Sequence, residues 1–348
     1  MVTAHVPSAH TDQWLRGTRG TESRQPQEEK RKRKRESDQL FPQLLTASTS
    51  ALRLDNRPAS APLTPSVAYS PTQRGTATLT LSHPASPAVK TIILASVHAE
   101  LVPPRQERPY EGQVQIHLNT ALAQGTSSAS RSNPSAEAST AELERQLDLA
   151  LRRSGLIDRE ALCLKAGEAV WNISVNISCL SLRAGNALQG CILASTLALM
   201  DYVRPDAAVE EGGEIKIFDE GERVGVKLPI TGGLVGVEIA VFLPPLPSSS
   251  GGGTTTTSTA DGEVASLEPI LLLDPTPLEV TLSSALLTYV LTPNTGQFLL
   301  AEKIGEAPLD VDVMLKGMKA VETRARGLGK WVDESKKQRD EQVGKEIN

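Results

Sequence analysis

Alternating hydrophobic and polar residues predict a strand in the middle of the chain. From residue 171 to residue 179, apolar side chains occupy every second position, with Asn or Ser between them. Successive side chains on a strand point to opposite faces, so this pattern predicts a half-buried β-strand with one polar face. Residues 187–202 are apolar on almost every side, as in a buried helix. Pro205 disfavours helix at Arg204, so we expect the helix to end there.

The flanking patterns predict further strands and two more helices. Residues 141–153 carry leucine at every fourth position, which predicts an amphipathic helix, and a second one is expected from Val311 to about Lys337. Many strands with few helices predict an α+β fold. The expected strands are 75–81, 89–102, 112–118, 214–218, 224–228, 236–242, 269–273, 278–291 and 297–304.

Composition divides the chain into one domain and two tails. Residues 1–50 are polar and lack apolar periodicity, so we expect a disordered N-terminal tail that contains a basic tract. Residues 51–337 are expected to form one domain, interrupted by a low-complexity loop at 124–140 and a flexible insertion at 244–262. Residues 338–348 are expected to form a charged C-terminal tail.

Charge, cysteine content and hydropathy exclude several classes. The net charge of −5 argues against a protein that coats nucleic acid with its whole surface, although a local basic patch remains compatible with RNA binding. The three cysteines have no close spacing, which favours a reducing compartment. The longest apolar stretch is too short for a bilayer and no signal-peptide core is present, so we expect a soluble, intracellular protein.

Sequence motifs for metal, nucleotide or hydrolase chemistry are absent. The five histidines lack metal-ligand spacing, and the chain has no Cys-x-x-Cys, Walker loop or Gly-x-Ser-x-Gly. We therefore expect no metal and no cofactor.

Six consecutive cations lie within the N-terminal tail. Such a run is compatible with a nuclear localisation signal, with a solvated charge run, or with an RNA contact. The six residues are Lys30, Arg31, Lys32, Arg33, Lys34 and Arg35.

Several segments, in order along the chain, resemble the RNase PH family. The first, Arg53-Leu-Asp-Asn-Arg57, resembles the Arg-Leu-Asp-Gly-Arg that opens many members, and Leu272-Leu-Asp-Pro275 resembles the family's Val-Asp-Pro. Between them lie a second-strand segment from Val89 to Pro103 and the strand at 171–179, followed by a glycine turn at 183–186, the buried helix and the stop Arg204-Pro-Asp206. Within the family, the chain is most similar to non-catalytic ring subunits of the eukaryotic RNA exosome, which implies an RNase PH-like fold.

The resemblance also identifies a degenerate active site. Active members bind phosphate with a Gly-Gly-Thr-Arg turn before the buried helix, and here Ala187 and Leu188 stand at the Thr and Arg positions. A leucine has no donor, whereas an arginine binds phosphate bidentately. Arg183, in the same turn, is a partial substitute to consider. The two acidic positions, which serve a divalent cation or acid–base chemistry, fall at Val280 and Leu286. We therefore expect no catalytic residues.

The resemblance implies a structural role in an exosome ring that threads RNA to a separate nuclease. The implied partners are other RNase PH-like ring subunits, RNA-binding cap subunits and RNA, without a membrane. The implied location is the nucleus and nucleolus, and also the cytoplasm. Two alternatives stay open: an active phosphate-dependent 3′–5′ exoribonuclease or nucleotidyltransferase, and a nuclear protein unrelated to RNA.

Arg105 and Arg108 are candidates for RNA contact. They lie in a proline-flanked loop, residues 103–109, between two predicted strands. The resemblance implies that this loop faces the channel of the ring. The alternative is a pair of solvent-exposed arginines with Glu107 as a local partner.

Overall fold

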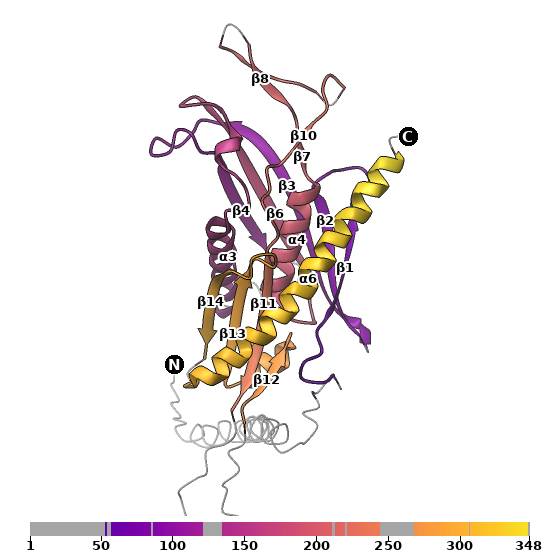
Figure 1. Cartoon of the computed structure of the whole chain (residues 1–348), viewed down its shortest axis with the longest axis vertical. Helices are drawn as coiled ribbons and strands as arrows, with labels where there is room; N and C mark the ends of the chain where they lie inside the picture. Colours follow the sequence, from indigo (N-terminus) through magenta and orange to yellow (C-terminus); the bar gives the residue numbers. More distant parts are fainter. Residues whose placement is uncertain are drawn as a thin grey trace, which may run out of the picture.

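The computed structural model describes residue 53 and residues 57–84, 86–120, 134–210, 213–219, 221–243, 268–305 and 307–346 (Figure 1). Three of the features expected from the sequence lie outside these residues. They are the N-terminal tail with its basic tract, residues 124–133 of the expected loop, and the expected insertion at 244–262.

The alternating segment forms the strand β6, Ala169–Leu182, inside the larger sheet. Its apolar positions from 171 to 179 are buried and the polar positions from 174 to 178 are half-buried, which confirms the predicted alternation. The strand order is β1-β2-β3-β6-β4, and β5 also pairs with β6. Strand β4 runs parallel to β6, and the other pairs are antiparallel. The other strands are β1 (Thr64–Tyr69), β2 (Thr76–His83), β3 (Ser86–Val102), β4 (Gln113–Asn119) and β5 (Cys163–Lys165).

A second sheet contains four antiparallel strands in the order β12-β11-β13-β14. The expectation of one strand over residues 278–291 is wrong, because a helix, α5 (Pro277–Leu282), precedes β13. Thr276 and Glu279 form a capping box around Pro277 at the first helical turn, and this arrangement favours helix over strand. The strands are β11 (Val235–Phe242), β12 (Ile270–Leu273), β13 (Ala285–Leu291) and β14 (Phe298–Ile304).

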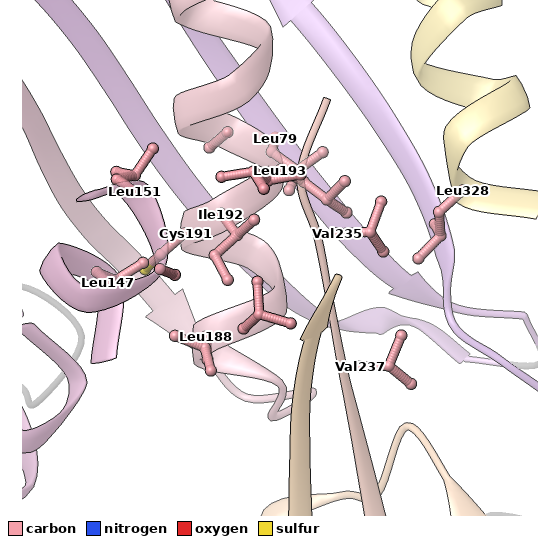
Figure 2. Close-up of a cluster of buried hydrophobic side chains, with 14 of the residues drawn as sticks. Leu79, Leu147, Leu151, Leu188, Cys191, Ile192, Leu193, Val235, Val237 and Leu328 are labelled. Carbon is pink, nitrogen blue, oxygen red and sulfur yellow. The ribbon is translucent and has the colours of Figure 1, made fainter. Parts of the chain in front are cut away.

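The predicted buried helix is α4, Ala187–Asp201, and it packs against strands of both sheets. All its residues except Ala187 and Met200 are buried. Figure 2 shows its side chains directed toward α3, β2 and β11. The approach to the larger sheet is close, since a Cβ added to Gly190 would lie 2.5 Å from Cδ1 of Ile93. The helix therefore forms the centre of a sheet–helix–sheet arrangement.

Two helices flank this core, and both are longer than the sequence indicated. Helix α3 spans Pro134–Ser154, so residues 134–140, expected as loop, are helical. Proline is favoured at the first helical position, which accounts for the early start. Helix α6 spans Val311–Glu346 and runs across β11 and α4, so residues 338–346, expected as a charged tail, are also helical (Figure 1).

A buried carboxylate explains why the end of α6 is ordered. Asp201, the last residue of α4, accepts hydrogen bonds from Nε of Arg74 at 3.0 Å and from Nε of Arg339 at 3.0 Å. It also accepts one from the backbone N–H of Gly75 at 2.9 Å. Arg339 is buried, and its guanidinium lies 5.2 Å from the ring centroid of Tyr69. One carboxylate thus joins α4, α6 and the turn between β1 and β2.

Two short antiparallel strand pairs extend from one end of the body, and the hairpin β8–β9 lies within the segment that joins β7 to β10 (Figure 1). Strand β7 (Val203–Arg204) pairs with β10 (Val226–Lys227), and β8 (Ala207–Val209) pairs with β9 (Ile215–Ile217). A 3-10 turn, Glu160–Leu162, precedes β5. Of the helices in the described part of the chain, none is long and apolar enough to cross a membrane.

Candidate functional site

The four degenerate positions, Ala187, Leu188, Val280 and Leu286, line a single cleft of about 610 Å³. The lining residues come from α3, the first turn of α4, strands β6, β11, β13 and β14, and α5. Positions far apart in the sequence therefore meet in space. The remaining lining residues are Thr120, Thr140, Glu142, Leu143, Gln146, Leu182, Gly185, Asn186, Glu238, Pro277, Thr288 and Ile304.

The charged residues that line this cleft are acidic. Glu142 and Glu238 are the charged side chains among its described lining residues, and no lysine or arginine from the described part of the chain lines it. Arg183, the partial substitute considered from the sequence, is not among the lining residues. Arginine binds phosphate through a charged, bidentate pair of donors, and the described lining of this cleft supplies no such side chain.

Glu238 lies where a bound anion would be expected. The first N–H groups of a helix lack intrahelical partners, and they form a ready site for anions. Here the carboxylate of Glu238, on β11, accepts a hydrogen bond from the backbone N–H of Leu188 in the first turn of α4. Burial, followed by the nearby charge of Asp274, raises the pKa of Glu238 to about 7, although the Leu188 hydrogen bond opposes this rise. The chain thus places its own carboxyl group at the start of α4.

The turn before α4 places an amide in the cleft. Gly185 has φ 81°, and a Cβ there would lie 2.8 Å from the carbonyl oxygen of Pro275, so the position requires glycine. Asn186 has φ 54°, a conformation that Asn adopts more readily than most residues. Its side chain is 3% exposed, does not cap the helix, and has no hydrogen-bond partner for either amide atom.

Buried ion pairs stabilise the part of the cleft formed by α5. They involve the two segments, 53–57 and 272–275, that resemble the RNase PH family. Arg53 donates from Nε to Glu279 at 2.9 Å, and Arg57 donates from Nη2 to the carbonyl oxygen of Asp274 at 3.1 Å. The carboxylate of Asp274 accepts from Arg324 at 3.0 Å. The two resembling segments therefore contact each other, and their arginines support the loop before α5.

In the structure, two further arginines lie beside the loop that carries Arg105 and Arg108. A second pocket, of about 360 Å³, is lined by Arg105 and Arg108 together with Arg152 from the end of α3 and Arg159. Arg108 pairs with Glu111 at 2.9 Å, whereas the sequence had suggested Glu107 as the local partner. The Arg-Arg pair that closes the predicted helix was the sequence signal for this wider cluster.

Metal ligation has no candidate in the described part of the chain. No group of three or more His, Cys, Asp or Glu side chains is placed there to hold an ion.

Comparison of this sequence with known proteins finds similarity to one protein family. Residues 63–205 match the family described as "3' exoribonuclease family, domain 1" (RNase_PH). Exosome complex component RRP45 of Danio rerio is 38% identical over 154 residues, which cover 44% of this chain and 38% of that protein. RRP45A of Arabidopsis thaliana is 27% identical over 250 residues, which cover 70% of this chain and 71% of that protein. The match therefore spans less than half the length of the vertebrate relatives.

Solved structures share the fold. A chain described as "archaeoglobus fulgidus exosome with RNA bound to the active site" has a TM-score of 0.57 at 19% identity, covering 83% of this chain and 98% of that one. A chain described as "Archaeal exosome core" has a TM-score of 0.56 at 17% identity, covering 85% and 99%. The predicted RNase PH-like α+β fold is thus confirmed.

Replacing Glu238 with Gln tests its electrostatic role through stability. The folded-state pKa of about 7 lies above the ordinary 4.5, so the folded protein loses stability as pH rises from about 4.5 through 7. We expect Glu238→Gln to be more stable than the unmodified chain at pH 8, by on the order of 1–3 kcal/mol, and to lose most of this advantage at pH 5. Urea unfolding at both pH values measures the difference.

The exposed Glu222 provides the matched control. Glu222→Gln is expected to change stability by no more than about 0.5 kcal/mol at either pH. An equal effect of Glu238→Gln at pH 5 and pH 8 would contradict the raised pKa.

Proposed function

We propose a non-catalytic role for this chain, which carries an RNase PH domain and is homologous to the exosome component RRP45, the PM/Scl autoantigen type. The chain acts as a structural subunit of the exosome core ring. The ring supports 3′–5′ processing and degradation of rRNA, mRNA and other RNA by threading the strand through its channel. The chemistry takes place on a separate nuclease.

The chemistry of the large cleft carries the proposal. A phosphate-dependent nuclease must hold an anionic nucleophile against an anionic backbone, and cationic donors or metal ions make this possible. At the expected positions this chain has Ala187, Leu188, Val280 and Leu286, and Glu238 bonds the first turn of α4. Ala187 and Leu188 remove the phosphate donors, Val280 and Leu286 remove the carboxylates that serve a divalent cation or acid–base chemistry, and Glu238 adds a carboxyl group. The alternative of an active exoribonuclease or nucleotidyltransferase is therefore not supported by this site.

Exposed apolar side chains suit the assembly part of the proposal. Val311 and Leu315, on the first turns of α6, are 66% and 50% exposed, and Val224, between β9 and β10, is 91% exposed. Contiguous exposed apolar patches are typical of surfaces that bind another protein, and Val311 and Leu315 lie one helical turn apart on the same side of α6. The proposed partners are the other RNase PH-like ring subunits and the RNA-binding cap subunits.

RNA contact is proposed for the arginine pocket. Arg105, Arg108, Arg152 and Arg159 outnumber the acidic lining residues Glu107 and Glu111. Such a net positive pocket binds phosphates independently of base sequence. A threading channel requires contact of this kind.

Nuclear and nucleolar localisation, together with a cytoplasmic pool, is proposed from the basic tract. Import receptors recognise extended cationic peptides through charge complementarity. Neutral residues at positions 30–35 are expected to lower nuclear accumulation without preventing assembly, and unchanged nuclear levels in cell imaging would refute this role.

The assembly proposal is tested by co-purification. The full chain carrying an affinity tag, expressed at its natural level, is expected to bring down the other RNase PH-like subunits in near-equal amounts, because ring subunits form obligate contacts. Quantitative mass spectrometry of the purified material measures the stoichiometry. Recovery of the chain as a well-behaved monomer without these subunits would reject the ring assignment.

Restoring part of the phosphate site tests the loss of catalysis. Neither the purified chain nor the double variant Ala187→Thr/Leu188→Arg is expected to shorten RNA in the presence of inorganic phosphate, because Val280 and Leu286 still supply no carboxylate. The readout is nucleoside diphosphate released from a 3′-labelled RNA. Activity in either protein would overturn the pseudo-enzyme proposal.

Removing two arginines tests the RNA path. In the assembled ring, Arg105→Gln/Arg108→Gln is expected to weaken RNA binding similarly for all sequences, and to lower the slope of log affinity against log salt by roughly one to two phosphate contacts. Fluorescence anisotropy at several salt concentrations measures both quantities.

The control for this variant removes the same charge elsewhere. Arg326→Gln/Lys337→Gln neutralises two exposed cations on α6 and is expected to leave the salt slope unchanged. Equal slopes in the test and control variants would remove the 103–109 loop from the RNA path.

A further inference from the structure

The hairpin β8–β9, which projects from the body, presents an exposed apolar face (Figure 1). In the register of the two strands, Ala207 is opposite Ile217 and Val209 is opposite Ile215, so these four side chains lie on one face. Val209 is 42% exposed and Ile217 is 49% exposed. A sheet of two strands is marginally stable alone, and a third strand with a shared apolar face stabilises it. This hairpin therefore has a face that a further strand would cover.

The backbone of β9 forms an open edge of this sheet. Among the described strands, the sheet contains β8 and β9 alone, and β8 lies beside β5. The N–H of Phe218 donates to the carbonyl oxygen of Asp206 at 2.9 Å. Inward and outward groups alternate along an antiparallel pair, so the N–H and C=O groups of Ile215 and Ile217 point away from β8. They form the row of donors and acceptors with which an added strand pairs.

The cations of the hairpin lie on its other face. A lysine on an edge strand often prevents pairing with another chain. Here Lys216 alternates with Ile215 and Ile217, and its Nζ lies 5.2 Å from the ring centroid of Phe218. The guanidinium of Arg223 lies 3.8 Å from the same centroid and pairs with Asp206 at 3.1 Å. Neither of these cations covers the apolar face.

Carboxylates determine which chain suits this edge. Four exposed ones lie at the ends of the two strands and in the loop after β9, and none pairs with a cation of the described chain: Glu210, Glu214, Asp219 and Glu222. Complementary charge steers partners together and disfavours the wrong ones. A second copy of this hairpin would bring the same carboxylates against these, whereas a positively charged segment would neutralise them.

We propose that β9 accepts an extended segment of another protein as a third strand, and that this segment alternates apolar with polar residues and carries net positive charge. The outward backbone groups of Ile215 and Ile217 pair with the backbone of the segment. Its apolar side chains pack beside those of Ile215, Ile217 and Val209, and its cations lie near the carboxylates. This inference does not rest on the ring function, because every group that it uses belongs to the hairpin.

The probe is a short synthetic peptide with blocked ends, in which valine alternates with threonine and lysine. It is titrated into the full chain, or into the co-purified assembly if the chain is obtained in that form, with fluorescence anisotropy as the readout. We expect saturable binding. The same peptide methylated on all backbone nitrogens cannot donate to β9, and a version with glutamate in place of lysine meets like charge. Each is expected to bind at least about tenfold more weakly.

The variant Ile217→Pro tests the role of the backbone. The N–H of Ile217 points toward the open edge, so proline removes an outward donor and retains the bonds to β8. The matched control, Ile217→Ala, shortens the same side chain and keeps the N–H. We expect peptide affinity to fall about tenfold or more with proline, and to fall less with alanine.

Hydrogen exchange, resolved to single residues by mass spectrometry, gives the signature of an added strand. We expect the peptide to slow exchange at the amides of Ile215 and Ile217. The amide of Lys216 already points toward β8, so its exchange rate is expected to stay unchanged. This pattern is measured in the unmodified chain, so it tests the proposal even where proline disrupts the hairpin.

Several results would overturn the proposal. They are no binding of the valine–lysine peptide at millimolar concentration, equal binding of the methylated or the glutamate peptide, and protection that does not alternate along β9. Equal affinity in Ile217→Pro would also reject it. Self-association of the chain that Ile217→Pro abolishes would assign the edge to a second copy instead of a different protein.

Discussion

The burial of α4 on all sides is the constraint on which the rest of the structure depends. An apolar helix of this length must be covered by more than one surface, and the two sheets with α3 and α6 provide that cover. Its two ends carry the polar chemistry. At the carboxyl end, the charge of Asp201 opposes the helix dipole, and Arg74 and Arg339 compensate for it. At the amino end, the backbone N–H of Leu188 donates a hydrogen bond to Glu238, and the first turn of the helix lines the large cleft.

The pattern of hydrophobic residues predicted those elements whose burial is visible in their own sequence. Strand β6 and helix α4 were predicted closely, because alternation and all-round apolarity report burial directly. Helix α5 was missed because its apolar residues resemble a strand, although Thr276 and Glu279 carried a capping signal. The end of α6 was missed because its order depends on Arg339 reaching Asp201, a contact between residues distant in sequence.

The candidate site likewise contains residues that the sequence identified and residues that only the structure identified. The resemblance identified Ala187, Leu188, Val280 and Leu286, and the fold brings these four residues into one cleft. Glu238 and Asn186 were not identified as site residues, since a glutamate in a strand and an asparagine in a turn look ordinary in sequence. Their importance follows from burial and from partners on other elements. Arg152 and Arg159 were likewise not identified with Arg105 and Arg108, because the fold brings them together from other segments.

The position of α6 in the sequence has a consequence for biosynthesis. This helix follows every described strand, yet it supplies Arg324 to Asp274 and Arg339 to Asp201, two carboxylates that are almost fully buried. A nascent chain that lacks its final turns therefore contains the complete set of strands with a buried negative charge missing an arginine partner. Asp201 keeps Arg74 as a partner in that state, but a buried carboxylate with fewer partners still opposes closure of the core. Synthesis of α6 thus acts as a checkpoint, because the described domain reaches full stability only after this helix has been made.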